Sequence, residues 1–131
     1  MQTGGCLCGA IRFQIDTDDI SSAKCYCRDC QYVSGGEPAA VVRVPCNSLK
    51  VDGEPKEYRS KADSGAEVFR SFCPQCGTPL FAGHENFADY INIKVGALDD
   101  PTTFKAQILV WPESAQPWHT VDGSIPHITR H

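Results

Sequence analysis

The segment Cys73-Pro74-Gln75-Cys76-Gly77 is the most informative stretch of this sequence. Two residues between two cysteines permit a tight turn that points both sulfurs at one ion, and Gly77 supplies the backbone freedom to leave that turn. A second close pair, Cys6-Leu7-Cys8, lies near the start of the chain. Zinc prefers four thiolate or imidazole ligands in a tetrahedron, so two such pairs can make one closed site. We therefore expect a structural zinc site on Cys6, Cys8, Cys73 and Cys76.

Such a site would tie the first strand to the middle of the chain. Residues two apart on a strand face the same side, so the spacing of Cys6 and Cys8 predicts a strand that presents both sulfurs to one metal. Zinc binding by cysteine-rich peptides contributes roughly 10–16 kcal/mol, against a net domain stability of roughly 5–15 kcal/mol. Loss of this metal should therefore unfold the protein. The alternative, a redox dithiol at Cys73 and Cys76, lacks the strand and long helix of a thioredoxin-like motif.

Three further cysteines fall within six residues, in Cys25-Tyr26-Cys27-Arg28-Asp29-Cys30. Three ligands leave one corner of a zinc tetrahedron open, as in catalytic zinc sites. An open corner can hold water, polarise a carbonyl oxygen or capture a thiol as its thiolate. We expect a second, catalytic zinc on Cys25, Cys27 and Cys30. The alternative is that Cys46 closes this site and makes it a second structural zinc.

The pattern of apolar residues predicts an all-β fold. Ile11, Phe13 and Ile15 alternate with polar residues, which is the period of two expected for a strand with one buried face. Short β-branched or aromatic runs continue along the chain, and 11 glycines and 9 prolines spread turns over its whole length. These further runs are 41–44, 49–51, 68–72, 91–95 and 105–111. The only helix expected is a short one over 28–34, ended by Gly35-Gly36.

Composition bounds the organisation and the partners. The 131 residues suit a single domain over 1–131, and the chain has no linker-like stretch. The net charge is -4 and basic residues are scattered singly, which argues against nucleic acid as a partner. No apolar stretch approaches the ~20 residues needed to cross a bilayer, and no secretory signal precedes the first cysteine pair. We therefore expect a cytoplasmic protein whose eight cysteines stay reduced.

Three motifs in order carry a resemblance to a known family: 5–10 (GCLCGA), 25–30 (CYCRDC) and 72–78 (FCPQCGT), with 96–101 (GALDDP) as a later match. With these motifs the sequence resembles the glutathione-dependent formaldehyde-activating enzyme family, which includes centromere protein V. The resemblance implies a β-tent type zinc fold of short antiparallel strands. It also implies a structural zinc on the four paired cysteines and a catalytic zinc on the cluster of three.

The activity that the resemblance implies is that of a carbon–sulfur lyase, the reversible joining of formaldehyde to the glutathione thiol to give S-hydroxymethylglutathione. Many members of the family have His where this chain has Tyr26, so the thiol or the aldehyde can differ. Two other readings stay open: a module that binds or carries glutathione or a thiol adduct without turnover, and a zinc-stapled scaffold for protein contacts. The sequence leaves the physiological substrate and the oligomeric state open.

Overall fold

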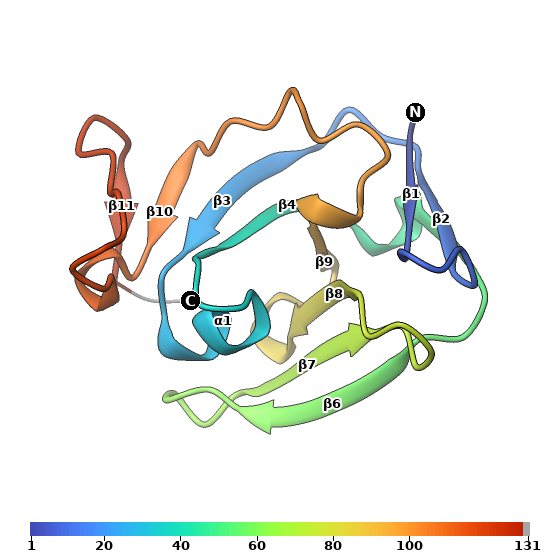
Figure 1. Ribbon diagram of the computed structural model, residues 1–131, viewed down its shortest axis with the longest axis horizontal. Coiled ribbons are helices and arrows are strands. Elements are labelled where there is room, and N and C mark those ends of the chain that lie inside the picture. Colours follow the sequence, from blue (N-terminus) through green and yellow to red (C-terminus); the bar gives the residue numbers. More distant parts are fainter. Residues whose placement is uncertain (130–131) are drawn as a thin grey trace.

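The computed structural model describes residues 1–129 and is built almost entirely of strands (Figure 1). Arg130 and His131, the end of the expected domain, lie outside the described residues. One short helix, α1 (Arg28–Val33), follows the third strand. The strands are β1 (Gln2–Gly5), β2 (Arg12–Ile15), β3 (Ser21–Cys25), β4 (Ala39–Pro45), β5 (Leu49–Asp52), β6 (Lys56–Lys61), β7 (Glu67–Phe72), β8 (Pro79–His84), β9 (Tyr90–Lys94), β10 (Ile108–Val110) and β11 (His127–Ile128). Single 3₁₀ turns are η1 (Cys46–Ser48), η2 (Glu85–Phe87), η3 (Val95–Ala97) and η4 (Pro112–Ser114).

The strands form two sheets, and the all-β prediction is confirmed. The small sheet has the order β1-β2-β5, and the large sheet has the order β11-β10-β3-β4-β9-β8-β7-β6. Most neighbours are antiparallel, but β10 runs parallel to both β3 and β11. The long connection from η3 to β10 runs back beside β3, where the Ser22 hydroxyl donates to the Lys105 carbonyl at 2.6 Å (Figure 1). Parallel pairing requires such a long return.

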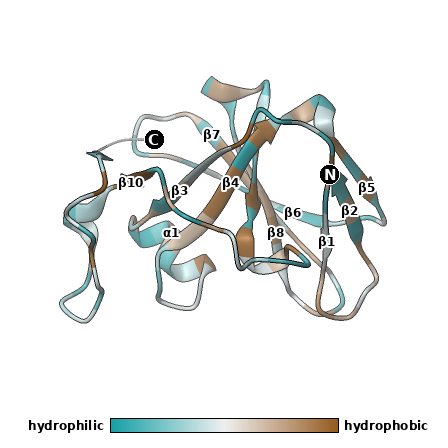
Figure 2. Cartoon of the chain, turned by 90° about the horizontal axis from the view of Figure 1, so that it is seen from above, coloured by the Kyte–Doolittle hydropathy of each residue, from teal (hydrophilic) through white to brown (hydrophobic). Residues whose placement is uncertain are grey.

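The main core lies where the two sheets meet. Ile11, Phe13 and Ile15 are at most 2% exposed, so the alternation read from the sequence is a buried face. The Phe13 ring meets the Phe81 ring of β8 edge to face at 5.3 Å between centroids, which joins the small sheet to the large one. Figure 2 shows a run of hydrophobic residues along β4, and Val44 of this strand is fully buried.

Some expected elements differ in position or extent. Cys6 and Cys8 were expected on a strand, but they lie in the turn between β1 and β2, where the Gly9 amide donates to the Cys6 carbonyl at 3.1 Å. Gly9 has a φ of 82°, which lets the chain reverse there. The run 105–111 is a strand only at β10, which ends before Trp111, where the backbone is left-handed with a φ of 54°. Among residues 1–129, no helix has the length and apolar character to span a membrane.

Candidate metal centres

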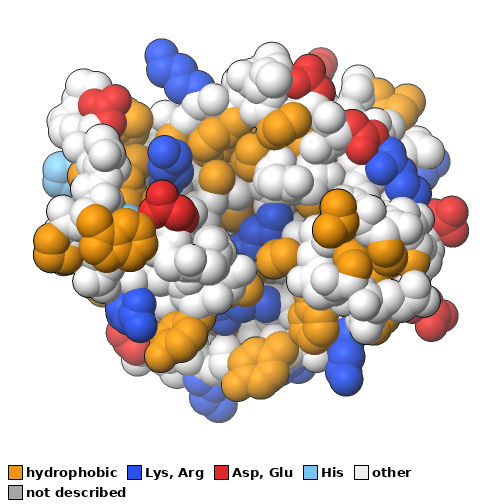
Figure 3. Space-filling model, in the orientation of Figure 1, with side chains coloured by type: hydrophobic (Ala, Val, Ile, Leu, Met, Phe, Trp, Pro, Cys, Tyr) orange, Lys and Arg blue, Asp and Glu red, His pale blue; other side chains and the backbone are white. Residues whose placement is uncertain are grey.

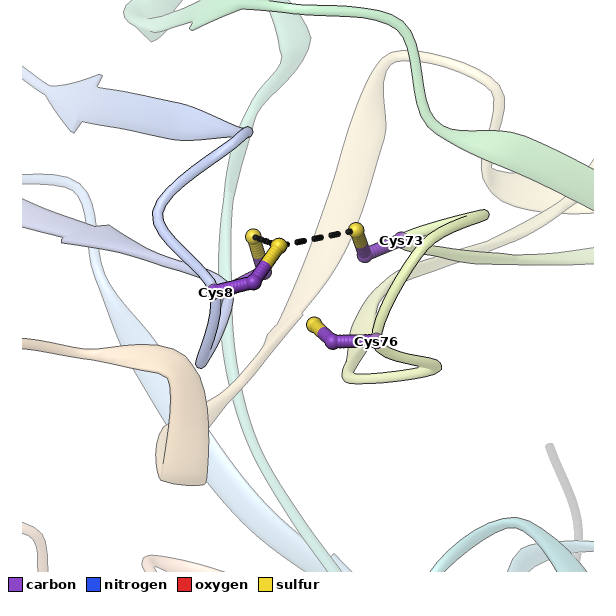
Figure 4. A group of neighbouring side chains, drawn as sticks. Cys8, Cys73 and Cys76 are labelled. Atoms are coloured by element: carbon purple, nitrogen blue, oxygen red, sulfur yellow. Dashed lines mark hydrogen bonds between the residues drawn. The ribbon is translucent and has the colours of Figure 1, made fainter.

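Two turns from distant parts of the sequence bring four sulfurs together. Cys6 and Cys8 come from the β1–β2 turn, and Cys73 and Cys76 come from the β7–β8 turn. Figure 4 shows how the side chains of Cys8, Cys73 and Cys76 lie near one another. The Cys6 and Cys8 sulfurs are 3.6 Å apart, and the Cys8 and Cys73 sulfurs are 3.8 Å apart. A tetrahedral site with zinc–sulfur bonds of about 2.3 Å requires sulfurs about 3.8 Å apart. The geometry therefore fits one four-thiolate zinc ion.

Backbone hydrogen bonds hold the β7–β8 turn in this shape. The Gly77 amide donates to the Cys73 carbonyl at 2.9 Å, and Gly77 has a φ of 78°. Thr78 connects the two turns, because its hydroxyl accepts from the Leu7 amide at 3.0 Å and also contacts the Cys76 sulfur at 3.1 Å. The contact with the Thr78 hydroxyl lowers the pKa of Cys76 to about 5. This thiol is thus prepared to act as a thiolate ligand.

A second group of three sulfurs lies where β3 passes into α1. We call Cys25, Cys27 and Cys30 the cysteine trio; their sulfurs all lie within 4.8 Å of one another. Cys25 is the last residue of β3, and Cys27 is the N-cap of α1. The Cys27 sulfur accepts a hydrogen bond from the Cys30 amide at 3.4 Å. The short helix thus fixes two of the three sulfurs relative to the end of the strand.

The charge on the trio is also typical of a metal site. Contacts with the Cys25 and Cys27 sulfurs lower the pKa of Cys30 to about 3, and contacts with Cys27 and Cys30 raise the pKa of Cys25. One thiolate is therefore favoured by its neighbours, while further negative charge is opposed. A divalent cation removes this opposition and allows all three sulfurs to be thiolates. The donor set fits zinc.

Buried hydrogen bonds hold the loop that carries the trio. The Gln31 side chain is buried and donates to the Tyr26 carbonyl at 2.7 Å and to the Ser114 carbonyl at 3.0 Å. The Tyr26 side chain is buried too, and its hydroxyl donates to the Thr120 carbonyl at 2.9 Å. Tyr26 therefore anchors the C-terminal segment to the loop.

Cys46 does not join the trio. It follows Pro45 at the opposite end of β4 from Ala39, the residue that pairs with Cys25. Its thiol is exposed and donates to the Ala88 carbonyl at 3.4 Å. Among residues 1–129, no other cysteine, histidine or carboxylate comes within the same reach of all three trio sulfurs. Within this part of the chain, the protein thus offers three ligand atoms at this position.

A cleft of about 270 Å³ opens beside Cys27, between α1 and the hairpin that joins β6 to β7. Of the trio, Cys27 lines this cleft. Its other walls come from the start of α1, the β6–β7 hairpin, the end of β8 and the segment after β10. The lining residues are Cys27, Arg28, Asp29, Ala62, Asp63, Ser64, His84, Trp111 and Ser114.

Two cations near the trio were missed by sequence reasoning. Lys94 is 8% exposed; its burial lowers the pKa of its amine, and the negative charge of Cys30 opposes this effect. Arg70 lies with a guanidinium nitrogen 4.0 Å from a carboxylate oxygen of Asp29 on α1. Both residues are distant in sequence from the trio, so only the pairing of the strands could reveal them.

A sequence model described as glutathione-dependent formaldehyde-activating enzyme matches residues 1–114. The chain belongs to this family. The family resemblance predicted from the cysteine motifs is thereby confirmed.

A crystal structure of a Rhodobacter sphaeroides protein is similar in fold to this family member, with a TM-score of 0.61. The two share 16% sequence identity, and the match covers 96% of this chain and 99% of the other. At this identity the likeness supports the fold alone. A search of curated proteins found no match.

Proposed function

We propose that this protein is a zinc-dependent carbon–sulfur lyase that reversibly joins a thiol such as glutathione to a small aldehyde such as formaldehyde. The observation that carries the proposal is the trio, three sulfurs within 4.8 Å of one another with a cleft beside Cys27. Membership in a family named for glutathione and formaldehyde supports this choice of substrates.

The reaction is an addition to a carbonyl group. The thiol sulfur forms a bond to the carbonyl carbon, the electron pair of the C=O double bond moves to oxygen, and the thiol proton ends on that oxygen. Breaking the same C–S bond returns thiol and aldehyde, so no oxidant or reductant is needed. Zinc held by Cys25, Cys27 and Cys30 would supply a Lewis acid that favours the thiolate form of a thiol or polarises the aldehyde oxygen.

The protein's own residues would prepare the site for this chemistry. Lys94 and Arg70 place positive charge beside the trio, which favours an incoming thiol in its anionic form. We call Cys6, Cys8, Cys73 and Cys76 the four-cysteine group. As a structural zinc site, this group would hold the β1–β2 and β7–β8 turns in place. Zinc–thiolate ligands must stay reduced, and for this reason the proposal places the protein in the cytoplasm.

Exchange measurements on the purified zinc protein test the proposal. Glutathione and formaldehyde are mixed, and the exchange between free and adduct forms is followed by NMR with and without protein. We expect faster exchange with the zinc-loaded protein, and loss of this acceleration in Cys30→Ser. Cys46→Ser is the matched control and should retain it. Exchange at the uncatalysed rate with zinc-loaded protein would exclude the lyase.

A carrier that binds glutathione without turnover is the second candidate, because the same open corner and cleft would serve it. Calorimetry separates the two functions: saturable binding with no change in the exchange rate would identify a carrier. The third hypothesis, a zinc-binding scaffold for protein contacts, depended on Cys46 as the fourth ligand of the second site. Cys46 lies apart from the trio, so this hypothesis loses the feature that favoured it.

A further inference from the structure

One face of the large sheet carries a row of polar and basic side chains. Cross-strand pairing places Arg43 of β4 opposite Asn92 of β9, Asn92 opposite Ala82 of β8, and Ala82 opposite Arg70 of β7. Directly paired residues of antiparallel strands project from the same side of a sheet. Arg43 and Arg70 therefore stand on one face.

The same face carries two lysines. Lys94 is two residues from Asn92 on β9, and Lys56 is two residues beyond the Arg70 partner Tyr58 on β6. Side chains two apart on a strand share a face. Across β3, β4, β9, β8, β7 and β6, the residues on this face include four cations and no Asp or Glu. This separation of charge is notable in a chain whose net charge is -4.

The basic face adjoins the trio. Cys25 pairs with Ala39, and Lys94 pairs with Val41, two residues further along the same strand. Arg70 reaches α1 next to the trio, with a guanidinium nitrogen 4.0 Å from a carboxylate oxygen of Asp29, the residue before Cys30. Figure 3 shows Lys and Arg side chains at the bottom of a hollow in the middle of the face seen in Figure 1.

The arginines on this face keep their charge available. The Arg43 Nε donates to the Asn92 Oδ1 at 3.3 Å, and an Arg70 guanidinium nitrogen donates to the Ser60 Oγ at 3.3 Å. Both acceptors are neutral, so these contacts orient the guanidinium groups without neutralising them. The carboxylate that reaches Arg70 is Asp29, at 4.0 Å, with a side chain that is 62% exposed. A zinc ion bound by the three thiolates of the trio would have a net charge of −1. The positive charge of this face is larger than that, so it would remain available to an anionic ligand.

We propose that Arg70 and Lys94 beside the trio, with Arg43 further along the same face, form an anion-binding subsite that selects a thiol substrate carrying a carboxylate over a neutral thiol of similar size. This inference rests on the proposed function, since it names the class of thiol that the same site accepts. Arginine suits the role because its planar guanidinium binds a carboxylate through two hydrogen bonds.

Calorimetry on the zinc-loaded full chain tests the subsite with two probes, glutathione and its diethyl ester, which has the same thiol but no carboxylate. We expect glutathione to bind about tenfold or more tightly than the ester, as for a charge-assisted contact of about 1.5–3 kcal/mol. Arg70→Gln should weaken binding of glutathione much more than binding of the ester, and so remove most of this preference. Added salt should also reduce the preference.

Matched variants separate the subsite from general damage to the protein. Arg59 lies on the same hairpin but pairs with Phe69 on the opposite face, so Arg59→Gln should retain the preference. Arg43→Gln is a second subsite variant, for use if Arg70→Gln folds poorly. Measuring the zinc content of each variant shows whether a change in binding comes from loss of metal. Equal binding of glutathione and its ester to the unmodified protein, or an equal loss for both probes in the two subsite variants, would overturn the proposal.

Calorimetry and the NMR exchange measurements together separate this inference from the lyase proposal. Preferential binding of glutathione without faster exchange would leave the subsite standing and remove the lyase. Faster exchange with no preference for the carboxylate-bearing thiol would remove the subsite and leave the lyase.

Discussion

The seven clustered cysteines are placed mainly by their immediate neighbours. Gly77 and Thr78 shape the turn that carries Cys73 and Cys76, and the first turn of α1 sets the distance between Cys27 and Cys30. These contacts are local in sequence, so the spacing predicts each close group of cysteines. The approach of the Cys6–Cys8 turn to Cys73 and Cys76 depends on long-range contacts such as that of Leu7 with Thr78. The same spacing could not fix Cys46, whose position depends on the length of β4.

Replacing one cysteine from each group should have different consequences. Cys73→Ser removes a fully buried thiol of the four-cysteine group, which we propose as the structural zinc site. We expect the protein to unfold because metal binding worth roughly 10–16 kcal/mol would be compromised. Cys30→Ser should leave the fold intact and release one zinc ion per chain. Metal analysis and circular dichroism measure both effects.

Cys46→Ser is the control for these two variants and should change neither zinc content nor fold, since its thiol lies apart from both groups. A folded Cys73→Ser protein with one zinc ion fewer would contradict the structural role of the four-cysteine group. Loss of zinc in Cys46→Ser would contradict the open second site.

The strands were predicted best where one face is buried and the other is wet. The buried alternation at Ile11, Phe13 and Ile15 is clear in the sequence, whereas β6 is polar along its whole length and was missed. Strand β6 exists because it pairs with β7 over six residues, from Lys56 to Lys61. Such pairing is a property of the sheet and leaves no hydrophobic period in the strand itself.

Within β8, Gly83 is required by close packing against β7. A Cβ atom at Gly83 would lie 2.1 Å from the Phe69 ring, which is much closer than a carbon contact allows. We expect Gly83→Ala to lower the free energy of unfolding by about 1–3 kcal/mol, as for other overpacked positions. Urea denaturation measures the change. Gly96→Ala is the control, because a Cβ there meets nothing within 4 Å, and an equal loss in both variants would contradict the packing argument.

Over the whole molecule, Asp99 connects the small sheet to the segment after η3. Its carboxylate accepts from the Thr3 hydroxyl at 2.6 Å and from the Arg12 guanidinium at 2.9 Å. The hydrogen bonds from Arg12 and Thr3 lower the pKa of Asp99 to about 2, from an ordinary value of 3.8. A carboxyl with a lowered pKa in the folded state stabilises the protein above its ordinary pKa, and this effect is lost as the pH falls through about 2.

Asp99→Asn should therefore lower the urea midpoint slightly, by the same amount at pH 5 and pH 7, since both lie above the ordinary and the lowered pKa values. The difference from the unmodified protein should shrink only below about pH 4. Added salt should reduce the difference in urea midpoint, because the side chains of Arg12 and Asp99 are both nearly half exposed. A difference that changes between pH 5 and pH 7 would show that another group is responsible.

The sequence by itself determined the family, the all-β class and the grouping of cysteines into a set of four and a set of three. The close pairs and the group of three follow from short-range spacing, and the all-β class follows from apolar alternation. Only the tertiary structure decided that Cys6 and Cys8 lie in a turn, that Cys46 stands apart, and that β10 runs parallel to β3. It also gathered Arg43, Arg70 and Lys94 on one face beside the trio. Basic residues that are single in the sequence become neighbours through strand pairing, and that register is set by contacts across the whole sheet.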